Sequence, residues 1–155
     1  MLQSRRLSGN EDWLSDESKE VLLKCLKAER LVDMLSEQEP HGSSPWLATF
    51  AQLKALVPPG VYELHKSTSQ EPKFYTVLGV GDHTEDGSFL VACIAHYAPH
   101  KGNLCYRPLC GEGGFLEPVV KRASQTHEHE RLVPRFAFVR HLTQNFDLFV
   151  ELDTG

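Results

Sequence analysis

The stretch from Gly60 to Phe115 constrains the fold of this 155-residue chain more than any other. It reads GVYELHK, then KFYTVLGVGDHTEDGSFLVACIAHYA, then NLCYRPLCGEGGF, so that apolar runs rich in valine, tyrosine and phenylalanine alternate with polar breaks. Runs of this length and composition are typical of short antiparallel strands. Gly79 and Gly81 interrupt the alternation, as expected where a strand bends or bulges. The stretch therefore predicts a small, strongly bent antiparallel sheet.

Two helices are predicted before this sheet. The first is capped by Ser15 and runs to about Glu37, with an apolar stripe at Val21, Cys25, Ala28, Val32 and Leu35. Its other face carries basic residues that we interpret as solvated, namely Lys19, Lys24, Lys27 and Arg30. The second helix covers Trp46 to Leu56, with Ser44 at the N-cap and Pro45 in the first turn. We expect its apolar side, at Trp46, Phe50 and Leu53, to pack against the sheet.

The segments after Phe115 are harder to assign. The run LEPVVKR predicts a short strand, and the polar run from 123 to 132 predicts an exposed loop. The run RFAFVRHL is apolar on both faces, which favours a strand that is central in the sheet or covered by a helix. For residues 143–155 the pattern fits a strand and a helical turn equally.

These elements predict one domain of the α+β class, mainly β. Residues 1–14 are expected to be a flexible arm, residues 15–59 the helical part, and residues 60–155 the β part of a domain that spans 15–155. We expect the bent antiparallel sheet to approach an SH3-like barrel, flanked by the two helices. The oligomeric state is not predicted.

Composition argues against several classes of function. The net charge of −5 is shared between residues 1–59 and residues 60–155, and neither part has the basic surface that nucleic-acid binding usually needs. The longest apolar runs are too short for a membrane span, and the first residues lack the apolar core of a secretory signal. We therefore expect a cytoplasmic protein whose four cysteines are thiols.

The same central stretch resembles a family of small, mostly bacterial domains of unknown function. The motifs that carry the resemblance are Tyr62-x-x-His65-Lys66, Tyr75-x-Val77-x-Gly79, His83-Thr84-Glu85, Tyr97 and Arg107-Pro108. The resemblance extends over about Gly60 to Val119 and resumes at Arg135-Phe136, and it implies the compact β part only.

This chain departs from the family pattern at several positions. Ser67 stands where the family tends to have glycine, and the stretch from Ser67 to Pro72 is longer than usual. Cys93 and Cys105 occupy positions where aromatic residues are expected. An aromatic-lined pocket of relatives would therefore be altered here.

The polar members of these motifs form the predicted ligand site. Tyr62, His65, His83 and Arg107 are its main candidates, and Lys66 and Glu85 are weaker ones. Arginine and imidazole side chains suit an anionic ligand, and a histidine with a carboxylate can serve acid–base catalysis. The alternative is that each residue serves its own turn or strand end, because the run from His83 to Gly87 also has the composition of a tight hairpin turn.

Two other sets of residues could carry chemistry. His96, His100, Cys105 and Cys110 are of the types that zinc prefers, but their spacing fits no finger or ribbon, and we predict neither a metal nor a cofactor. Cys110 is followed by Gly111, Gly113 and Gly114, which would expose a nucleophilic thiol beside backbone amides.

The leading functional hypothesis is a small β module that binds a peptide or a small anion. The first alternative is a small hydrolase-like enzyme that acts on a phosphorylated or nucleotide-like compound through His65, His83, Glu85 and Arg107. The second alternative is a structural protein that binds a partner through its N-terminal helices. No membrane partner is expected.

Overall fold

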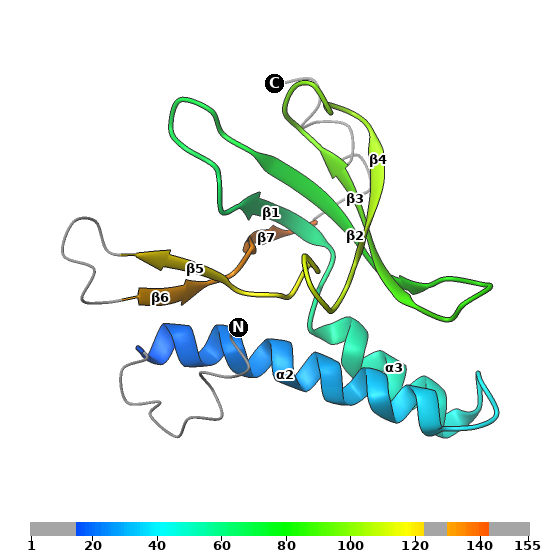
Figure 1. The fold of residues 1–155 in the computed structure, drawn as a ribbon. Coiled ribbons are helices and arrows are strands. Elements are labelled where there is room, and N and C mark those ends of the chain that lie inside the picture. The colour runs from blue at the N-terminus through cyan, green and yellow to red at the C-terminus, as the bar shows by residue number, and fades with distance from the viewer. Residues whose placement is uncertain (1–14, 123–129, 143–155) are drawn as a thin grey trace.

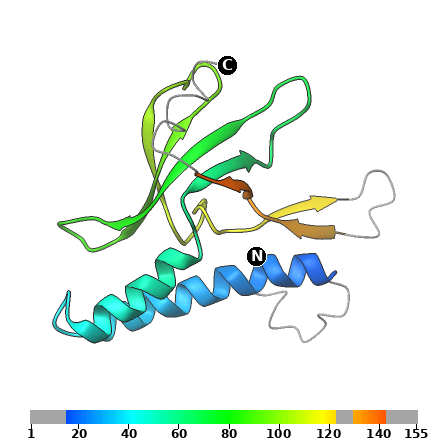
Figure 2. The same cartoon turned by 180° about the vertical axis from the view of Figure 1, so that it is seen from behind.

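The structure, a computed structural model, describes residues 15–122 and 130–142. The predicted arm at 1–14 and the run 143–155 lie outside the described residues. Helices α2 and α3 form one layer, and a twisted antiparallel sheet lies over them (Figure 1; Figure 2 shows the same from behind). The predicted α+β class with mainly β structure is confirmed.

Helix α2, Asp16–Glu37, has nearly the predicted bounds. The Ser15 hydroxyl accepts a hydrogen bond from the Ser18 N–H at 3.1 Å, which caps the helix as expected. The buried residues recur at helical spacing, at Leu22, Cys25, Ala28, Leu31 and Leu35. This stripe faces α3 and the sheet.

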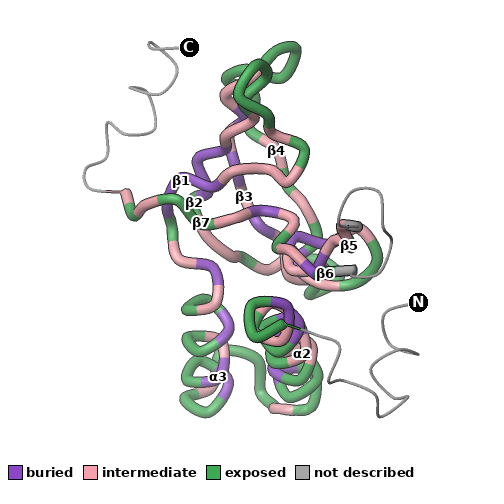
Figure 3. The backbone as a smooth tube through the Cα atoms, turned by 90° about the vertical axis from the view of Figure 1, so that its left-hand side faces the viewer, coloured by how far each residue is buried: buried purple, intermediate pink, exposed green. Residues whose placement is uncertain are grey.

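Helix α3, Ser44–Ala55, begins two residues before the predicted Trp46, and its N-cap is Ser43 instead of Ser44. The Ser43 hydroxyl accepts from the Trp46 N–H at 3.3 Å. Pro45 then lies in the first turn, where a missing N–H leaves no intrahelical bond unmade. Trp46 and Leu53 are buried in the same core as the sheet residues, as predicted, and the buried positions of α3 turn toward α2 (Figure 3).

The main sheet has the strand order β4-β3-β2-β1-β7, and all its pairs are antiparallel. Its strands are β1 (Gly60–Leu64), β2 (Phe74–Asp82), β3 (Phe89–Ala95), β4 (Leu104–Pro108) and β7 (Phe136–His141). The register between β2 and β3 shifts between Val77 and Gly79, where Gly79 has a φ of 138°. The predicted bulge therefore lies at a glycine because the backbone there adopts a conformation that side chains disfavour.

One prediction about the sheet, the position of β7, is wrong. In the described part of the chain the sheet is open, and β4 and β7 are its edges. Strand β7 is therefore not central, neither described helix covers it, and Phe138 and Val139 remain 42% and 48% exposed. Two of its apolar residues, Phe136 and Phe138, line a groove between the sheet edge and α2.

A second, two-stranded sheet pairs β5 (Val119–Arg122) with β6 (Glu130–Val133). The last residues of the loop predicted for 123–132 therefore form a strand, because the Leu132 side chain is buried against α2. The Ser18 hydroxyl donates to the Leu132 carbonyl at 3.3 Å and accepts from its N–H at 2.9 Å, and Leu22 packs on the Leu132 side chain. These contacts fix the N-terminal half of α2 beside the chain that leads into β7.

Candidate functional site

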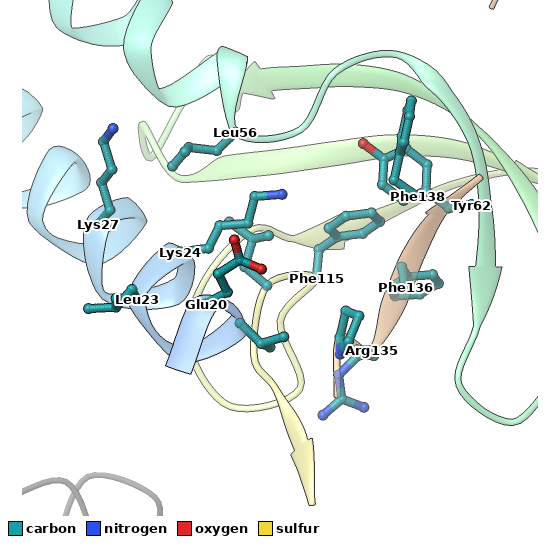
Figure 4. A pocket seen from close by; sticks show the side chains of 13 residues that line it. Glu20, Leu23, Lys24, Lys27, Leu56, Tyr62, Phe115, Arg135, Phe136 and Phe138 are labelled. Atoms are coloured by element: carbon teal, nitrogen blue, oxygen red, sulfur yellow. The ribbon is translucent and has the colours of Figure 1, made fainter. Parts of the chain in front are cut away.

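A groove of about 500 Å³ lies between α2 and the edge of the main sheet (Figure 4). Its volume is in the range of ligand-binding clefts. Segments far apart in the sequence contribute apolar side chains to it, which include Leu23 of α2, Leu56 after α3, Tyr62 of β1, Phe115 and Leu116, and Phe136 and Phe138 of β7. The buried Phe136 and the exposed Phe138 of β7 thus lie on one wall of this groove, whereas Val139 does not line it.

Aromatic contacts fix the wall on the sheet side. Phe115 and Phe136 stack in parallel with their ring centres 4.5 Å apart, and Tyr62 meets Phe115 and Phe138 edge to face at 5.4 and 5.3 Å. Tyr62 is 3% exposed, and its hydroxyl donates to the Pro58 carbonyl at 2.7 Å. Burial raises the pKa of Tyr62 above its usual value, so this phenol stays neutral and structural.

The helix side of the groove is basic. Glu20, Lys24 and Lys27 lie on successive turns, and the Lys24 side chain extends toward Phe115 (Figure 4). Burial among apolar neighbours lowers the pKa of Lys24, and the Glu20 carboxylate offsets this only in part. Lys24 and Lys27 are exposed, which agrees with the interpretation of this face as solvated, and both also line the groove.

Beside the groove lies a cationic cluster, which consists of His65, Lys66, Arg107, Lys121 and Arg135. The His65 N–H donates to the Arg135 carbonyl at 2.9 Å, and Lys121 Nζ donates to the His65 carbonyl at 3.0 Å. Burial lowers the pKa of His65, and the four neighbouring cations lower it further. This imidazole is thus held in its neutral form beside positive charge.

One carboxylate is embedded in this cationic cluster. Glu117 Oε1 accepts from Arg135 Nη2 at 3.2 Å and from the Gly113 N–H at 3.0 Å, while Arg107 Nη1 donates to the Gly113 carbonyl at 2.8 Å. The Arg107 guanidinium also lies 5.2 Å from the centre of the Phe136 ring, a cation–π distance. Arg135 lines the groove as well, and its buried Nε has no hydrogen-bond partner among the described residues.

The structure brings together only part of the predicted ligand site. His65, Lys66 and Arg107 share the cationic cluster, and Tyr62 lies on the groove wall. His83 does not join them, because it follows the far end of β2 while His65 lies beside its start. Nine strand residues separate the two ends by roughly 26 Å.

His83 and Glu85 serve the hairpin turn between β2 and β3. His83 Nδ1 accepts from the Glu85 N–H at 3.1 Å, and the Asp86 carboxylate accepts from the Ser88 N–H at 2.9 Å. These bonds hold the pKa of Asp86 below its usual value. The alternative interpretation of this motif as a local turn is the correct one, and the shared site with His83 and Glu85 is wrong.

The residues considered for zinc have other contacts. His96 Nε2 lies 2.6 Å from the Thr76 hydroxyl, His100 lies in an exposed turn after β3, and Cys105 faces Cys93 across two strands. Over residues 15–122 and 130–142, no three histidine, cysteine or acidic side chains group as metal ligands. Cys110 is half-buried, and burial together with nearby Cys25, Glu29 and Asp33 raises its pKa to about 12, so it is a poor nucleophile.

Comparisons with known proteins add no assignment. The chain matches no protein-family model, no curated protein and no solved structure. The resemblance to the small bacterial domain family therefore stays a prediction. Neither of the described helices is long and apolar enough to cross a membrane.

Sequence reasoning missed most of the groove. Phe115, Phe138 and Leu23 come from segments that meet only in the fold, where α2 packs on β6 just before β7, and no local motif marks them. The one available signal was RFAFVRHL, a strand with apolar residues on both faces. Such a strand at a sheet edge needs a partner surface for its second face.

Proposed function

We propose that this protein is a binding module and that its ligand is a peptide with both apolar and acidic side chains, held in the groove between α2 and β7. The observation that carries the proposal is the combination of an aromatic floor with the lysines of α2 in one cleft of about 500 Å³. An exposed apolar wall of this kind is a typical mark of an interaction site.

The charges of the groove favour an acidic partner. Lys24 is exposed on the groove, where desolvation lowers its pKa and Glu20 offsets this only in part, so a ligand carboxylate would further stabilise the charged amine. Lys27 adds a second cation one turn along the helix, and Arg135 adds a third on the opposite side. A basic peptide would meet three like charges instead.

This proposal joins two of the hypotheses drawn from the sequence, since the β part and the first helix both contribute to the groove. A small anion bound at the cationic cluster is the second candidate, and the unpartnered Arg135 Nε is the observation that favours it. We do not propose an enzyme, because its four candidate residues are divided between the cationic cluster and the distant hairpin turn. The net charge of −5 supports a ligand other than nucleic acid.

We also propose a cytoplasmic location and a compact β part of the SH3-like kind. None of the cysteines among the described residues forms a disulfide, which is consistent with a cytoplasmic location. The second is supported by the register shift at Gly79, since a bulge of this kind bends a strand and increases its twist.

The test is a panel of three short synthetic peptides titrated into the full chain. One combines phenylalanine and leucine with glutamate, one replaces each glutamate by lysine, and one replaces the apolar residues by serine. We expect the first to bind at least about tenfold more tightly than the others, a difference of about 1.4 kcal/mol.

A matched pair of variants locates the binding. Lys24→Glu should weaken binding of the acidic peptide at least about tenfold, whereas Arg30→Glu changes the same charge at an exposed position on α2 outside the groove and should have little effect. Equal loss in both variants, or equal binding of all three peptides, would refute the groove as the site. Binding of inorganic phosphate that is lost in Arg135→Gln, with no peptide binding, would favour the second candidate instead.

A further inference from the structure

Cys93 of β3 and Cys105 of β4 lie directly opposite each other on neighbouring antiparallel strands. Their sulfur atoms are 3.2 Å apart. Opposite residues in such a pair have Cα atoms roughly 4.5 to 5.5 Å apart, which falls in the range that a disulfide bridges. A bond between them requires the sulfurs to approach by about 1 Å.

The two thiols are held in a defined arrangement. Cys105 Sγ lies 3.4 Å from the Cys93 carbonyl oxygen, and Cys93 Sγ lies 3.7 Å from the Cys105 carbonyl oxygen. Both side chains point to the inner face of the sheet, where Arg107 follows two residues after Cys105 on β4. The pair is thus preorganised by the strand register and not by a mobile loop.

We propose that Cys93 and Cys105 form a redox-active dithiol site that exchanges with small disulfides such as oxidised glutathione. The thiolate of Cys105 attacks one sulfur of the small disulfide, a mixed disulfide forms on Cys105, and one glutathione thiolate leaves. The thiolate of Cys93 then attacks Cys105 Sγ, the protein disulfide forms, and the second glutathione thiolate leaves. Each cysteine gives up one proton, each of the two released glutathione thiolates takes up one of these protons, and the small disulfide is the oxidant.

Burial decides the order of the two steps. Cys105 is half-buried and lies on the edge strand β4, where a small disulfide can reach it, whereas Cys93 is 1% exposed. Burial and the contact with Cys105 also raise the pKa of Cys93, although the charge of Arg107 lowers it in part. Cys93 therefore reacts only when the electrophilic sulfur is already beside it.

This site is independent of the proposed groove, because neither cysteine lines it. The chain contains a competing pair, since Cys110 lies close enough to Cys25 for one thiolate to raise the pKa of the other. The experiment has to distinguish the two pairs.

The full chain is incubated with oxidised glutathione and then alkylated, and the remaining thiols and linked peptides are determined by mass spectrometry. We expect the protein to lose two of its four alkylatable thiols, with Cys93 linked to Cys105, and to regain them in dithiothreitol. Cys110→Ser is the matched control, because it removes a half-buried thiol and should leave the link unchanged.

Single variants test the order of the steps. Cys93→Ser should stop at a stable glutathione adduct on Cys105, and Cys105→Ser should give neither an adduct on Cys93 nor a link. Near-ultraviolet circular dichroism checks that each variant is folded. The proposal is overturned if folded wild-type protein keeps four thiols while urea-unfolded protein loses them, or if Cys25 and Cys110 form the link instead.

Discussion

The change Phe115→Ala tests whether the aromatic floor of the groove is also a central part of the core. Phe115 is 2% exposed, stacks on Phe136 at an interplanar angle of 2°, and meets Tyr62 edge to face. Its removal therefore breaks two ring contacts and leaves a void between the sheet and the groove.

Truncation of a buried phenylalanine to alanine costs about 3 to 5 kcal/mol. We expect a loss near the lower end, about 3 kcal/mol, because the void adjoins the groove and neighbouring side chains can move into it. For a domain of this size that loss corresponds to a fall in Tm of about 6 to 12 °C.

Phe138→Ala is the matched control, since it removes the same ring from the same groove. Phe138 is 42% exposed, so it loses only part of the roughly 1.5 to 3 kcal/mol that full burial of such a side chain provides, and we expect a cost of about 1 kcal/mol.

Urea unfolding followed by tryptophan fluorescence measures both costs, provided that the slope of the free energy of unfolding against urea is unchanged. The reasoning fails if Phe115→Ala costs no more than Phe138→Ala. It also fails if Phe115→Ala costs less than about 1.5 kcal/mol, because the ring would then not be part of the core.

Three further predictions follow from single contacts. His65 has a folded-state pKa below its unfolded value of about 6.5, so the unfolded chain binds more protons, and the free energy of unfolding should fall as the pH drops below about 6.5. NMR titration should give a His65 pKa under that value. The free energy of unfolding, measured with urea, should depend less on pH in His65→Gln than in the control His100→Gln. Gly60→Ala places a Cβ against the Arg140 carbonyl oxygen and 2.7 Å from Phe138 Cε1, so it should destabilise the protein by about 2 kcal/mol and weaken peptide binding. The control Gly81→Ala has open space around its Cβ, and it should change neither the stability nor the binding. Glu117→Gln leaves Arg135 without its ion pair and should lower the free energy of unfolding by about 1 kcal/mol, less so at high salt; an unchanged urea midpoint would show that solvent already screens this pair.

Local patterns predicted the elements well. The apolar stripe of α2 and the capping Ser15 gave its bounds to within a residue, and the glycine at position 79 marked the bulge of β2. Such features depend on residues a few positions apart, so the sequence carries them directly.

The site could not be predicted in the same way, because it depends on which segments meet. Periodicity places Lys24 on the face of α2 opposite the stripe, but it cannot indicate that β7 and Phe115 lie against that face. The motif His83-Thr84-Glu85 had the composition of both a site and a turn, and only the hydrogen bonds of His83 Nδ1 decide between them.

The position of β1 in the sheet has a consequence for how the chain folds. Strand β1 pairs on one side with β2, which follows it directly, and on the other with β7, whose residues 136–141 are synthesised much later. Until β7 emerges, the outer edge of β1 is unpaired and Tyr62 lacks its contact with Phe138, and an unpaired strand edge invites pairing with another chain. Closing this late pair is a contact of high sequence separation, which slows folding. A chain that stops before Phe136 should therefore aggregate, and peptide binding in the groove should report that β7 has docked.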